Sequence, residues 1–300
     1  MKKLWLALWV CAALLPRAAA LSAAAAVTMD ADTGETLFAE NADSRLPMAS
    51  TTKIMTALVA LGEGGLDRVY TVKKQYAAVE GSSMYLEEGE RLTLRDTLYG
   101  LMLSSGNDAA AAVAGECGGE RAFVDKMNAK ARELGLTDTR FENPSGLPSD
   151  GHYTTARELA KITAAALRDP VFRDIVSTKT CTAAGRTLVN HNRLLSLYED
   201  AIGVKTGFTR AAGRCLVSAA ERNGRTVIAV TLNDPDDWND HIALLDDAFS
   251  RYSEVTLHEK GDTLAQTQVF GGETDRAELV AESTVTAYLL PGEQDRLRRV

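Results

Sequence analysis

The order of hydrophobic and polar positions predicts strands at the start of the chain, followed by helices. The stretch "AVTMDADTGETLFAEN", residues 26–41, alternates on both sides of the turn residues Asp32, Thr33 and Gly34, which predicts a β-hairpin. From Ser50, apolar residues recur at every third or fourth position until "GEGG". This spacing predicts an amphipathic helix.

Helices continue through the middle of the chain. Thr93 and Asp96 have the spacing of a capping box at a helix start. A later helix starts at Thr155, and Pro170 is expected to mark its end. Three segments that precede Thr155 have helical spacing, namely residues 93–103, 107–116 and 120–134.

From about residue 202 the period changes to two, so a sheet is expected to resume after the helices. In "RCLVSAAERNGRTVIAVTLN" two alternating runs meet at Asn223 and Gly224, and Asn-Gly is the strongest short signal for a hairpin. Residues 236–252 have the pattern of an amphipathic helix. Beyond Ser253 we expect only short polar strands, so we place a domain boundary near residue 253.

The first twenty residues have the pattern of a secretory signal peptide. Lys2 and Lys3 precede an apolar run that is shorter than the ~20 residues of a membrane span, and a small-residue cleavage site ends at Ala20. We therefore expect export to the cell wall or periplasmic space. The expected organisation is a signal peptide at 1–20, one domain at 21–252 and a β-rich segment at 253–300.

Charge limits the partners. The formal net charge of the chain is −8 and becomes more negative without the leader, because Lys2, Lys3 and Arg17 are removed with it and no acid is. An acidic protein of this kind is not expected to bind nucleic acid or to adhere electrostatically to anionic lipid.

Cysteine content allows at most one internal disulfide. Cys11 belongs to the leader, which leaves Cys117, Cys181 and Cys215. We expect Cys117 to be a free thiol near the functional cleft, and a Cys181–Cys215 bridge stays open. No C-x-x-C or H-E-x-x-H spacing is present, so neither a metal nor another cofactor is expected.

The sequence "PMASTTKIMTALVAL" places Ser50 and Lys53 three residues apart at the start of an apolar helix. Residues three apart share one face of a helix, so a hydroxyl and an amine can point into one pocket and form an activated nucleophile. A simpler interpretation is that Ser50 caps the helix and Lys53 is a solvated charge. Short S-x-x-K matches are frequent by chance, and this pair alone does not decide.

Two later segments supply groups that such a nucleophile needs. "SSGNDAA" places Ser105 and Asn107 in a loop between two predicted helices, and "GVKTGFT" places Lys205, Thr206 and Gly207 on a predicted strand. Each segment alone is also an ordinary turn or strand end. Their order along the chain, after a helix that starts at the serine, is a far stronger signal than any one of them.

With these three motifs the chain resembles the serine penicillin-binding proteins and β-lactamases, whose motifs are S-x-x-K, S-x-N and K-T-G. It is most similar to the low-molecular-mass D-alanyl-D-alanine carboxypeptidases, through "GSSMYLEEGE", "FENPSGL", "HYTTARELA" and "NRLL". The resemblance covers about residues 25–252. It implies an α+β fold of the β-lactamase/transpeptidase type, in which a helical cluster packs on an antiparallel sheet with the site between them.

The resemblance also implies the roles of the site residues. Ser50 would be the acylated nucleophile and Lys53 its general base. The backbone N–H groups of Ser50 and Phe208 would form the oxyanion hole. Lys53 must be neutral to accept a proton, and a cationic Lys205 nearby would lower its pKa.

The remaining motif residues would bind substrate and move a proton. Ser105 would relay a proton to the leaving D-alanine, and Asn107 would hold the substrate amide. Lys205 and Thr206 would bind the terminal carboxylate, while Gly207 would let the substrate backbone lie close to the strand.

The implied activity is removal of the terminal D-alanine from peptidoglycan pentapeptide stems, with β-lactam antibiotics as covalent inhibitors. Glu142 in "FENPSGLP" does not fit the E-x-x-L-N pattern that deacylates class A β-lactamases, so we interpret it as structural. A β-lactamase and a non-catalytic peptidoglycan or β-lactam sensor remain the alternatives. Endopeptidase activity, oligomeric state and the choice between vegetative wall and spore cortex stay open.

The end of the chain departs from the family pattern. Carboxypeptidases of this kind usually carry a β-rich second domain and then an amphipathic helix that lies on the membrane. The segment after Ser253 is short and ends in "PGEQDRLRRV", which has no apolar face. We therefore expect an incomplete second domain in a released or truncated protein, and this C-terminus does not support membrane association.

Overall fold

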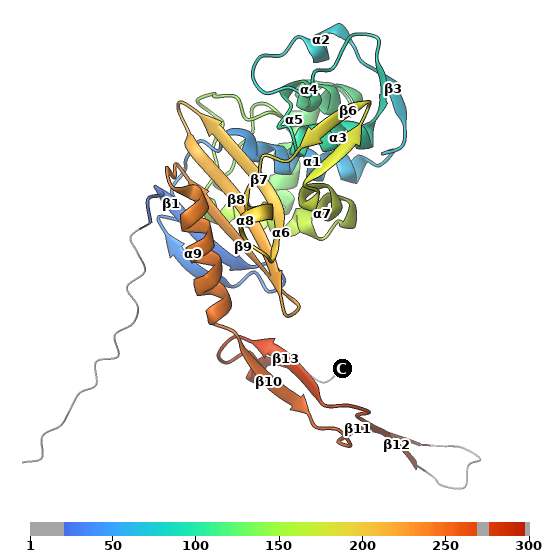
Figure 1. Cartoon of the computed structure of the whole chain (residues 1–300), viewed down its shortest axis with the longest axis vertical. Helices are drawn as coiled ribbons and strands as arrows, with labels where there is room; N and C mark the ends of the chain where they lie inside the picture. The colour runs from blue at the N-terminus through green and yellow to red at the C-terminus, as the bar shows by residue number, and fades with distance from the viewer. Residues whose placement is uncertain (1–20, 269–275, 298–300) are drawn as a thin grey trace, which may run out of the picture.

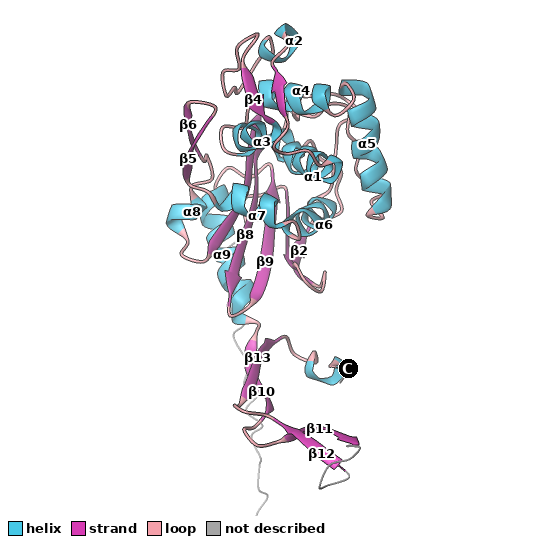
Figure 2. Ribbon diagram, turned by 90° about the vertical axis from the view of Figure 1, so that its right-hand side faces the viewer, coloured by secondary structure: helices cyan, strands magenta, loops and turns pink. Residues whose placement is uncertain are grey.

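The computed structural model describes residues 21–268 and 276–297. They form a helical cluster on an antiparallel sheet, with a narrow extension formed by the C-terminal strands (Figures 1 and 2). The five strands of the sheet lie in the order β2-β1-β9-β8-β7, so strands from the start of the chain pair with strands that follow the helices. The predicted α+β class is confirmed. The strands are β1 Ala25–Asp30, β2 Thr36–Glu40, β7 Ala201–Thr209, β8 Gly213–Arg222 and β9 Arg225–Leu232.

The hairpin between β8 and β9 has the turn that its sequence predicts. Asn223 at φ 52° and Gly224 at φ 73° both lie in the left-handed region, which a type I′ turn requires. The pairing runs from Arg222 opposite Arg225 at this turn to Cys215 opposite Leu232 at the other end. The predicted hairpin is therefore confirmed.

Helices with buried apolar faces cover one side of the sheet. Helix α1 lies among them and contacts α3, α4, α5, α6 and α7, while α6 also contacts β1 and β9. Ile54, Leu98 and Ile162 are fully buried in this layer. The helices are α1 Lys53–Glu63, α3 Leu94–Met102, α4 Asn107–Glu116, α5 Glu120–Glu133, α6 Ala156–Leu167 and α7 Pro170–Ser177.

The opposite side of the sheet is covered by α9, Asp237–Ser250 (Figure 1). Leu244, Leu245 and Ala248 are buried there against a second apolar cluster that includes Leu216 of β8. The amphipathic pattern over 236–252 thus predicts this helix correctly, although Trp238, Ile242 and Tyr252 are only partly buried.

Two local predictions need correction. Helix α6 ends at Leu167, three residues before Pro170. Pro170 is the first residue of a second helix, α7, which was not predicted from the sequence. Asp169 caps α7 by accepting a hydrogen bond from the Val171 N–H, and proline suits this first position because its missing N–H has no helical partner. The helix expected from Ser50 begins as a 3-10 turn, Ala49–Thr52, that leads into α1.

Several short elements have no clear signal in the sequence. Their strands are only three or four residues long, which is too short for a period of two to be recognised. They are the paired strands β3 Val69–Thr71 and β4 Arg91–Thr93, the paired strands β5 Thr180–Ala183 and β6 Arg186–Val189, and the helices α2 Lys74–Ala77 and α8 Leu194–Leu197.

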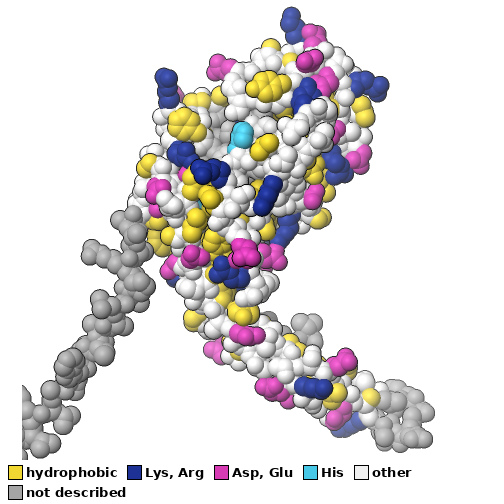
Figure 3. All heavy atoms as spheres, viewed as in Figure 1, with side chains coloured by type: hydrophobic (Ala, Val, Ile, Leu, Met, Phe, Trp, Pro, Cys, Tyr) yellow, Lys and Arg dark blue, Asp and Glu magenta, His cyan; other side chains and the backbone are white. Residues whose placement is uncertain are grey.

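The C-terminal extension is two antiparallel pairs followed by a single 3-10 turn, Gln294–Arg296. Charged side chains of both signs are scattered over it and over the domain (Figure 3). Arg225 of β9 ties it to the sheet, because its guanidinium donates to the Tyr288 carbonyl and to Glu293 at 2.7 Å each. The strands are β10 Ser253–His258, β11 Thr263–Gln268, β12 Arg276–Val280 and β13 Val285–Leu289.

The predicted signal peptide, residues 1–20, lies outside the described residues. Among the helices that the structure describes, none combines the length and the apolar character that crossing a membrane requires.

The three cysteines of the described chain are free thiols. Cys181 lies on β5 in a separate two-stranded sheet and Cys215 lies on β8 of the central sheet, so the bridge between them that the sequence left open is not formed. Cys117 follows α4 and is buried. Burial raises the pKa of Cys215 to about 11, which keeps this thiol protonated at neutral pH.

We expect alkylation of the unfolded mature chain without reductant to modify Cys117, Cys181 and Cys215. In the folded protein Cys181 should react first, because it is half-buried while the other two thiols are buried. Intact mass followed over time measures both results. Uptake of a single label by the unfolded mature chain would contradict the free-thiol assignment.

Candidate active site

Ser50 lies in the 3-10 turn that precedes α1, and close backbone contacts shape this turn. Ala49 has φ 48°, in the region that residues other than glycine seldom adopt. Gly146 lies against it, since a Cβ added there would come within 1.9 Å of the Ala49 carbonyl oxygen. The Thr52 hydroxyl donates to the same carbonyl at 2.8 Å. The turn before the serine is therefore held from two sides.

The side chain of Lys53 is fully buried beside Ser50. Its Nζ lies 3.0 Å from Ser50 Oγ, 2.8 Å from Asn107 Oδ1 and 2.6 Å from the Ser145 carbonyl oxygen. The sequence motif alone allows a solvated Lys53, and the observed burial excludes that interpretation.

The three partners of Lys53 differ in what they can do. The amide oxygen of Asn107 and the carbonyl of Ser145 only accept hydrogen bonds, whereas the Ser50 hydroxyl can also donate. A neutral amine has two N–H groups and one lone pair. With both N–H groups directed at the pure acceptors, the lone pair faces the Ser50 hydroxyl.

Burial lowers the pKa of Lys53 well below its usual value, and repulsion from the Lys205 ammonium lowers it further. Burial also lowers the pKa of Lys205 to about 7. The protein environment thus favours the neutral form of Lys53, which is the form that can accept a proton.

The loop "FENPSGL", residues 141–147, supplies the carbonyl that Lys53 contacts. Asn143 Oδ1 accepts hydrogen bonds from the backbone N–H groups of Ser145, Gly146 and Leu147, at 3.2, 2.7 and 3.2 Å. Thr56 of α1 donates to the Pro144 carbonyl at 2.6 Å. The loop is therefore fixed against the helix that carries Lys53.

The carboxylate of Glu142 in the same loop bonds with Ser149 and forms an ion pair with Arg140 at 3.4 Å. Glu142 lines a different surface depression, with residues of α5. The contacts of the Glu142 carboxylate therefore lie away from the cleft.

Ser105 enters the site from the loop between α3 and α4, and Asn107 enters it from the start of α4. Ser105 adopts φ 59° and lines the cleft, while Asn107 is the first residue of α4. The Asn107 side-chain N–H₂ donates to the Glu80 carbonyl at 2.8 Å, and its backbone N–H donates to the Ser82 carbonyl at 2.7 Å. These contacts direct the amide oxygen toward Lys53 and hold the 80–82 segment beside Ser105.

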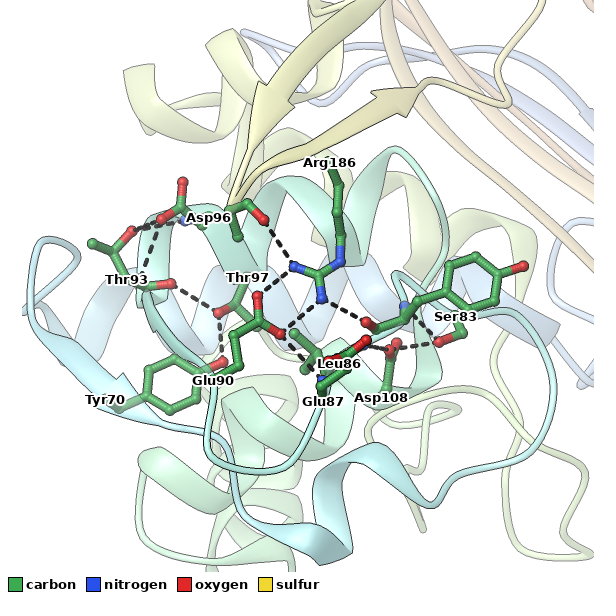
Figure 4. Close-up of polar contacts among 12 residues, drawn as sticks. Tyr70, Ser83, Leu86, Glu87, Glu90, Thr93, Asp96, Thr97, Asp108 and Arg186 are labelled. Atoms are coloured by element: carbon green, nitrogen blue, oxygen red, sulfur yellow. Dashed lines mark hydrogen bonds and ion pairs between the residues drawn. The ribbon is translucent and has the colours of Figure 1, made fainter.

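A polar network fixes the segment that follows Ser82 (Figure 4). Asp108, which is 1% exposed, accepts hydrogen bonds from the Ser83 hydroxyl and from the N–H groups of Met84 and Leu86. Arg186 of β6 forms an ion pair with both oxygens of Glu90 and donates to the Tyr85 carbonyl at 2.6 Å. Helix α4 and the β5–β6 hairpin therefore hold one wall of the cleft.

Strand β7 forms the opposite wall. Lys205 is 1% exposed and its Nζ donates to the Thr206 carbonyl at 2.9 Å. A Cβ added at Gly207 would come within 3.0 Å of the Ser50 backbone nitrogen, so a larger residue there would crowd the close approach of strand and turn. Phe208 follows and is 66% exposed at the cleft.

Together these walls enclose a cleft of about 300 Å³ that Ser50 lines. All eight residues singled out from the sequence lie in or directly beside it. Sequence reasoning missed further lining residues, because they come from separate elements and only the fold brings them together. The missed residues are Ser82, His191, Arg214, Asp237 and Trp238.

Residues 21–268 and 276–297 contain no cluster of three or more His, Cys, Asp or Glu side chains that could hold an ion.

Comparisons with known proteins agree with this geometry. Residues 13–236 match the family Peptidase_S11, D-alanyl-D-alanine carboxypeptidase. The D-alanyl-D-alanine carboxypeptidase DacF of Bacillus subtilis is 37% identical over 286 residues, which cover 90% of this chain and 73% of DacF. A D-alanyl-D-alanine endopeptidase of Pseudomonas aeruginosa is 36% identical over 73% of this chain and 74% of its own length.

A solved structure has the same fold. The crystal structure of the Streptomyces K15 DD-transpeptidase is 37% identical and superposes with a TM-score of 0.74, over 78% of this chain and 99% of that one. Identity at this level, together with a family match over most of the chain, settles the class of the protein. The chain belongs to the D-alanyl-D-alanine carboxypeptidase family S11, and it is a serine peptidase of the low-molecular-mass penicillin-binding type.

Proposed function

We propose that the protein is an exported serine carboxypeptidase that removes the terminal D-alanine from peptidoglycan pentapeptide stems through an acyl-enzyme on Ser50. The observation that carries this proposal is the environment of Lys53, whose amine lies 3.0 Å from Ser50 Oγ and otherwise contacts only acceptors. This arrangement gives the amine one partner that can donate a proton to it.

In the proposed acylation step, Lys53 takes the hydroxyl proton as Ser50 Oγ attacks the carbonyl between the two D-alanines. The N–H groups of Ser50 and Phe208 stabilise the developing oxyanion, with the Ser50 N–H at the start of a helical turn. Ser105 passes a proton to the amine of the leaving D-alanine. Asn107 holds Lys53 through its amide oxygen, and we assign to it the contact with the substrate amide.

Recognition of the free C-terminus is assigned to Lys205 and Thr206. Thr206 lines the cleft and Lys205 is buried directly behind it. The ammonium of Lys205 thus has two roles, attraction of the terminal carboxylate and repulsion that keeps Lys53 neutral. Gly207 leaves room for the substrate backbone beside the strand.

The setting of Glu142 bears on the fate of the acyl-enzyme. Its carboxylate bonds with Ser149 and Arg140 outside the cleft and is not placed to activate a water on Ser50. We therefore expect β-lactam acyl-enzymes to hydrolyse slowly, so that these antibiotics act as covalent inhibitors. This argues against the β-lactamase alternative.

We propose that the protein acts in the cell wall or periplasmic space. Peptidoglycan lies outside the cytoplasmic membrane, and the signal pattern at residues 1–20 predicts export. The P. aeruginosa relative is named an endopeptidase, so cleavage of cross-linked stems is a second activity to measure alongside D-alanine release.

We expect Ser50→Ala to abolish both D-alanine release and covalent penicillin labelling, because no other group in the cleft would carry the acyl intermediate. Lys53→Ala should lose nearly as much, since nucleophile and base act as one unit. Purified mature chain is incubated with a muramyl pentapeptide and with a cross-linked dimer, and products are identified by mass.

The results of this experiment distinguish the proposed enzyme from a non-catalytic sensor and test whether Ser50 is the nucleophile. Penicillin labelling without product from either peptide would identify a sensor and contradict the proposed enzyme. Labelling that persists on Ser104 or Ser105 in the Ser50→Ala variant would remove Ser50 as the nucleophile.

The two roles of Lys205 predict two effects of Lys205→Gln. Loss of a charge-assisted hydrogen bond to the terminal carboxylate should lower kcat/KM by roughly ten- to a hundredfold and reduce the preference for a free acid over an amidated peptide. Loss of repulsion should raise the pKa of Lys53, and since Lys53 works in its neutral form, the acidic limb of the pH profile should move to higher pH.

Both effects are read from pH profiles of acylation for the free and the amidated peptide. Lys179→Gln, which changes an exposed lysine on another surface, is the matched control and should change neither. An unchanged acidic limb in Lys205→Gln would refute the electrostatic role, and an unchanged free-acid preference would refute the carboxylate role.

A further inference from the structure

The segment where the predicted mature chain begins lies against an acidic cluster at the start of α9. The Ser22 hydroxyl donates to Asp234 and is also within 3.0 Å of Asp240 Oδ2, and the Ser22 backbone N–H donates to Asp240 Oδ2 at 2.8 Å. The Asp236 N–H in turn donates to Ser22 Oγ at 3.1 Å. Two carboxylates therefore approach one residue near the chain start.

Asp234 has an unmet interaction in this cluster. Its side chain is fully buried, and Oδ2 has no hydrogen-bond partner. Burial, opposed in part by hydrogen bonds from Ser22 and Thr231 and assisted by the neighbouring Asp240 carboxylate, raises the pKa of Asp234 to about 6. Buried charged groups are normally paired with an opposite charge, so the Asp234 carboxylate would be stabilised by a nearby cation.

The charged groups on the neighbouring elements do not supply that cation. Arg214 of β8 donates to Asp237 at 2.7 Å on the cleft side. His241 of α9 is buried between the hydroxyls of Ser218 and Thr231, and burial lowers its pKa to about 3, which leaves it uncharged. Within the described residues, no Lys or Arg forms an ion pair with Asp234 or Asp240.

The chain itself would provide a cation once the leader is removed. Hydrolysis of the Ala20–Leu21 peptide bond by a signal peptidase and one water gives a carboxylate on Ala20 and an ammonium on Leu21. The Leu21 nitrogen is three covalent bonds from the Ser22 nitrogen, and bonds of about 1.3 to 1.5 Å place the two within about 4 Å of each other.

The backbone next to this nitrogen is already held in place. The Leu21 side chain packs against the apolar cluster under α9, and the Ala24 N–H bonds to the carbonyls at the end of β9. We propose that Asp234 and Asp240 form a receptor site for the α-ammonium group of the processed N-terminus at Leu21, so that removal of the leader completes an ion pair at the start of α9.

Through this site, removal of the leader would affect residues that line the cleft. The Asp234 N–H donates to the Arg214 carbonyl at 2.9 Å, and Arg214, Asp237 and Trp238 all line the cleft. The buried ion pair would stabilise the end of the helix that carries two of these residues. The uncleaved chain has an amide at Leu21 and cannot make it.

The test compares two chains of equal formal charge. One begins at Leu21, and the other begins at Ala18 and so keeps Ala18, Ala19 and Ala20, which moves the ammonium by about 10 Å. At pH 7 the chain beginning at Leu21 should unfold at a temperature higher by roughly 2 °C or more. Equal unfolding temperatures would overturn the proposal.

Substitutions show whether the two carboxylates are responsible. In an Asp234→Asn, Asp240→Asn double variant the difference between the two chain starts should disappear. Asp247→Asn, which removes an exposed carboxylate from the same helix, should preserve the difference. A difference that persists in the double variant would assign the effect to another cause and overturn the proposal.

The pKa of the Leu21 amine gives a readout that requires neither an unfolding measurement nor the proposed enzyme activity. Ion pairing should raise the pKa of the Leu21 amine from its usual ~7.7 to 8.0 to above about 9. Because this pKa is raised on folding, the extra stability is present at neutral pH and is lost as pH rises through the folded value. Competitive acetylation of the N-terminal amine measures that pKa, and an ordinary value, or export processing at another bond, would refute the assignment.

Discussion

Burial of the Lys53 amino group is the constraint on which the site depends. A lysine ammonium is costly to remove from water unless its protons are bonded, and here the environment contains two acceptors and one hydroxyl but no carboxylate within hydrogen-bond distance. The neutral amine suits this environment better than the ion. The energetic cost of burying Lys53 thereby becomes the property that a general base requires.

The rest of the domain holds these partners in position. The side-chain oxygen of Asn143 accepts hydrogen bonds from three backbone N–H groups of the "FENPSGL" loop, and this holds the Ser145 carbonyl toward Lys53. Asn107 is held in place as the first residue of helix α4. Strand β7 approaches the serine turn closely at Gly207. Residues from four separate parts of the chain therefore contribute to the environment of one amine.

Much of the fold could be predicted because local signals are strong where the chain forms regular elements. The Asn223–Gly224 turn, the Thr93–Asp96 capping box and the apolar face of α9 each follow from a few neighbouring residues. Helix α7, which begins at Pro170, was not predicted from the sequence. Proline disrupts a helix interior but is also common at the first position of a helix, so Pro170 alone could not distinguish the two cases. Strands of three residues were missed because they show no period.

The sequence by itself determined the motif residues, their order, the family and the class of chemistry, because those depend on residue types and on spacing within single elements. Tertiary structure decided what the motifs mean physically. Only the fold buries Lys53 and Lys205, turns Glu142 out of the cleft, separates Cys181 from Cys215 and brings Arg214 and Trp238 to the wall. These features depend on contacts between residues far apart in the chain, which no local pattern encodes.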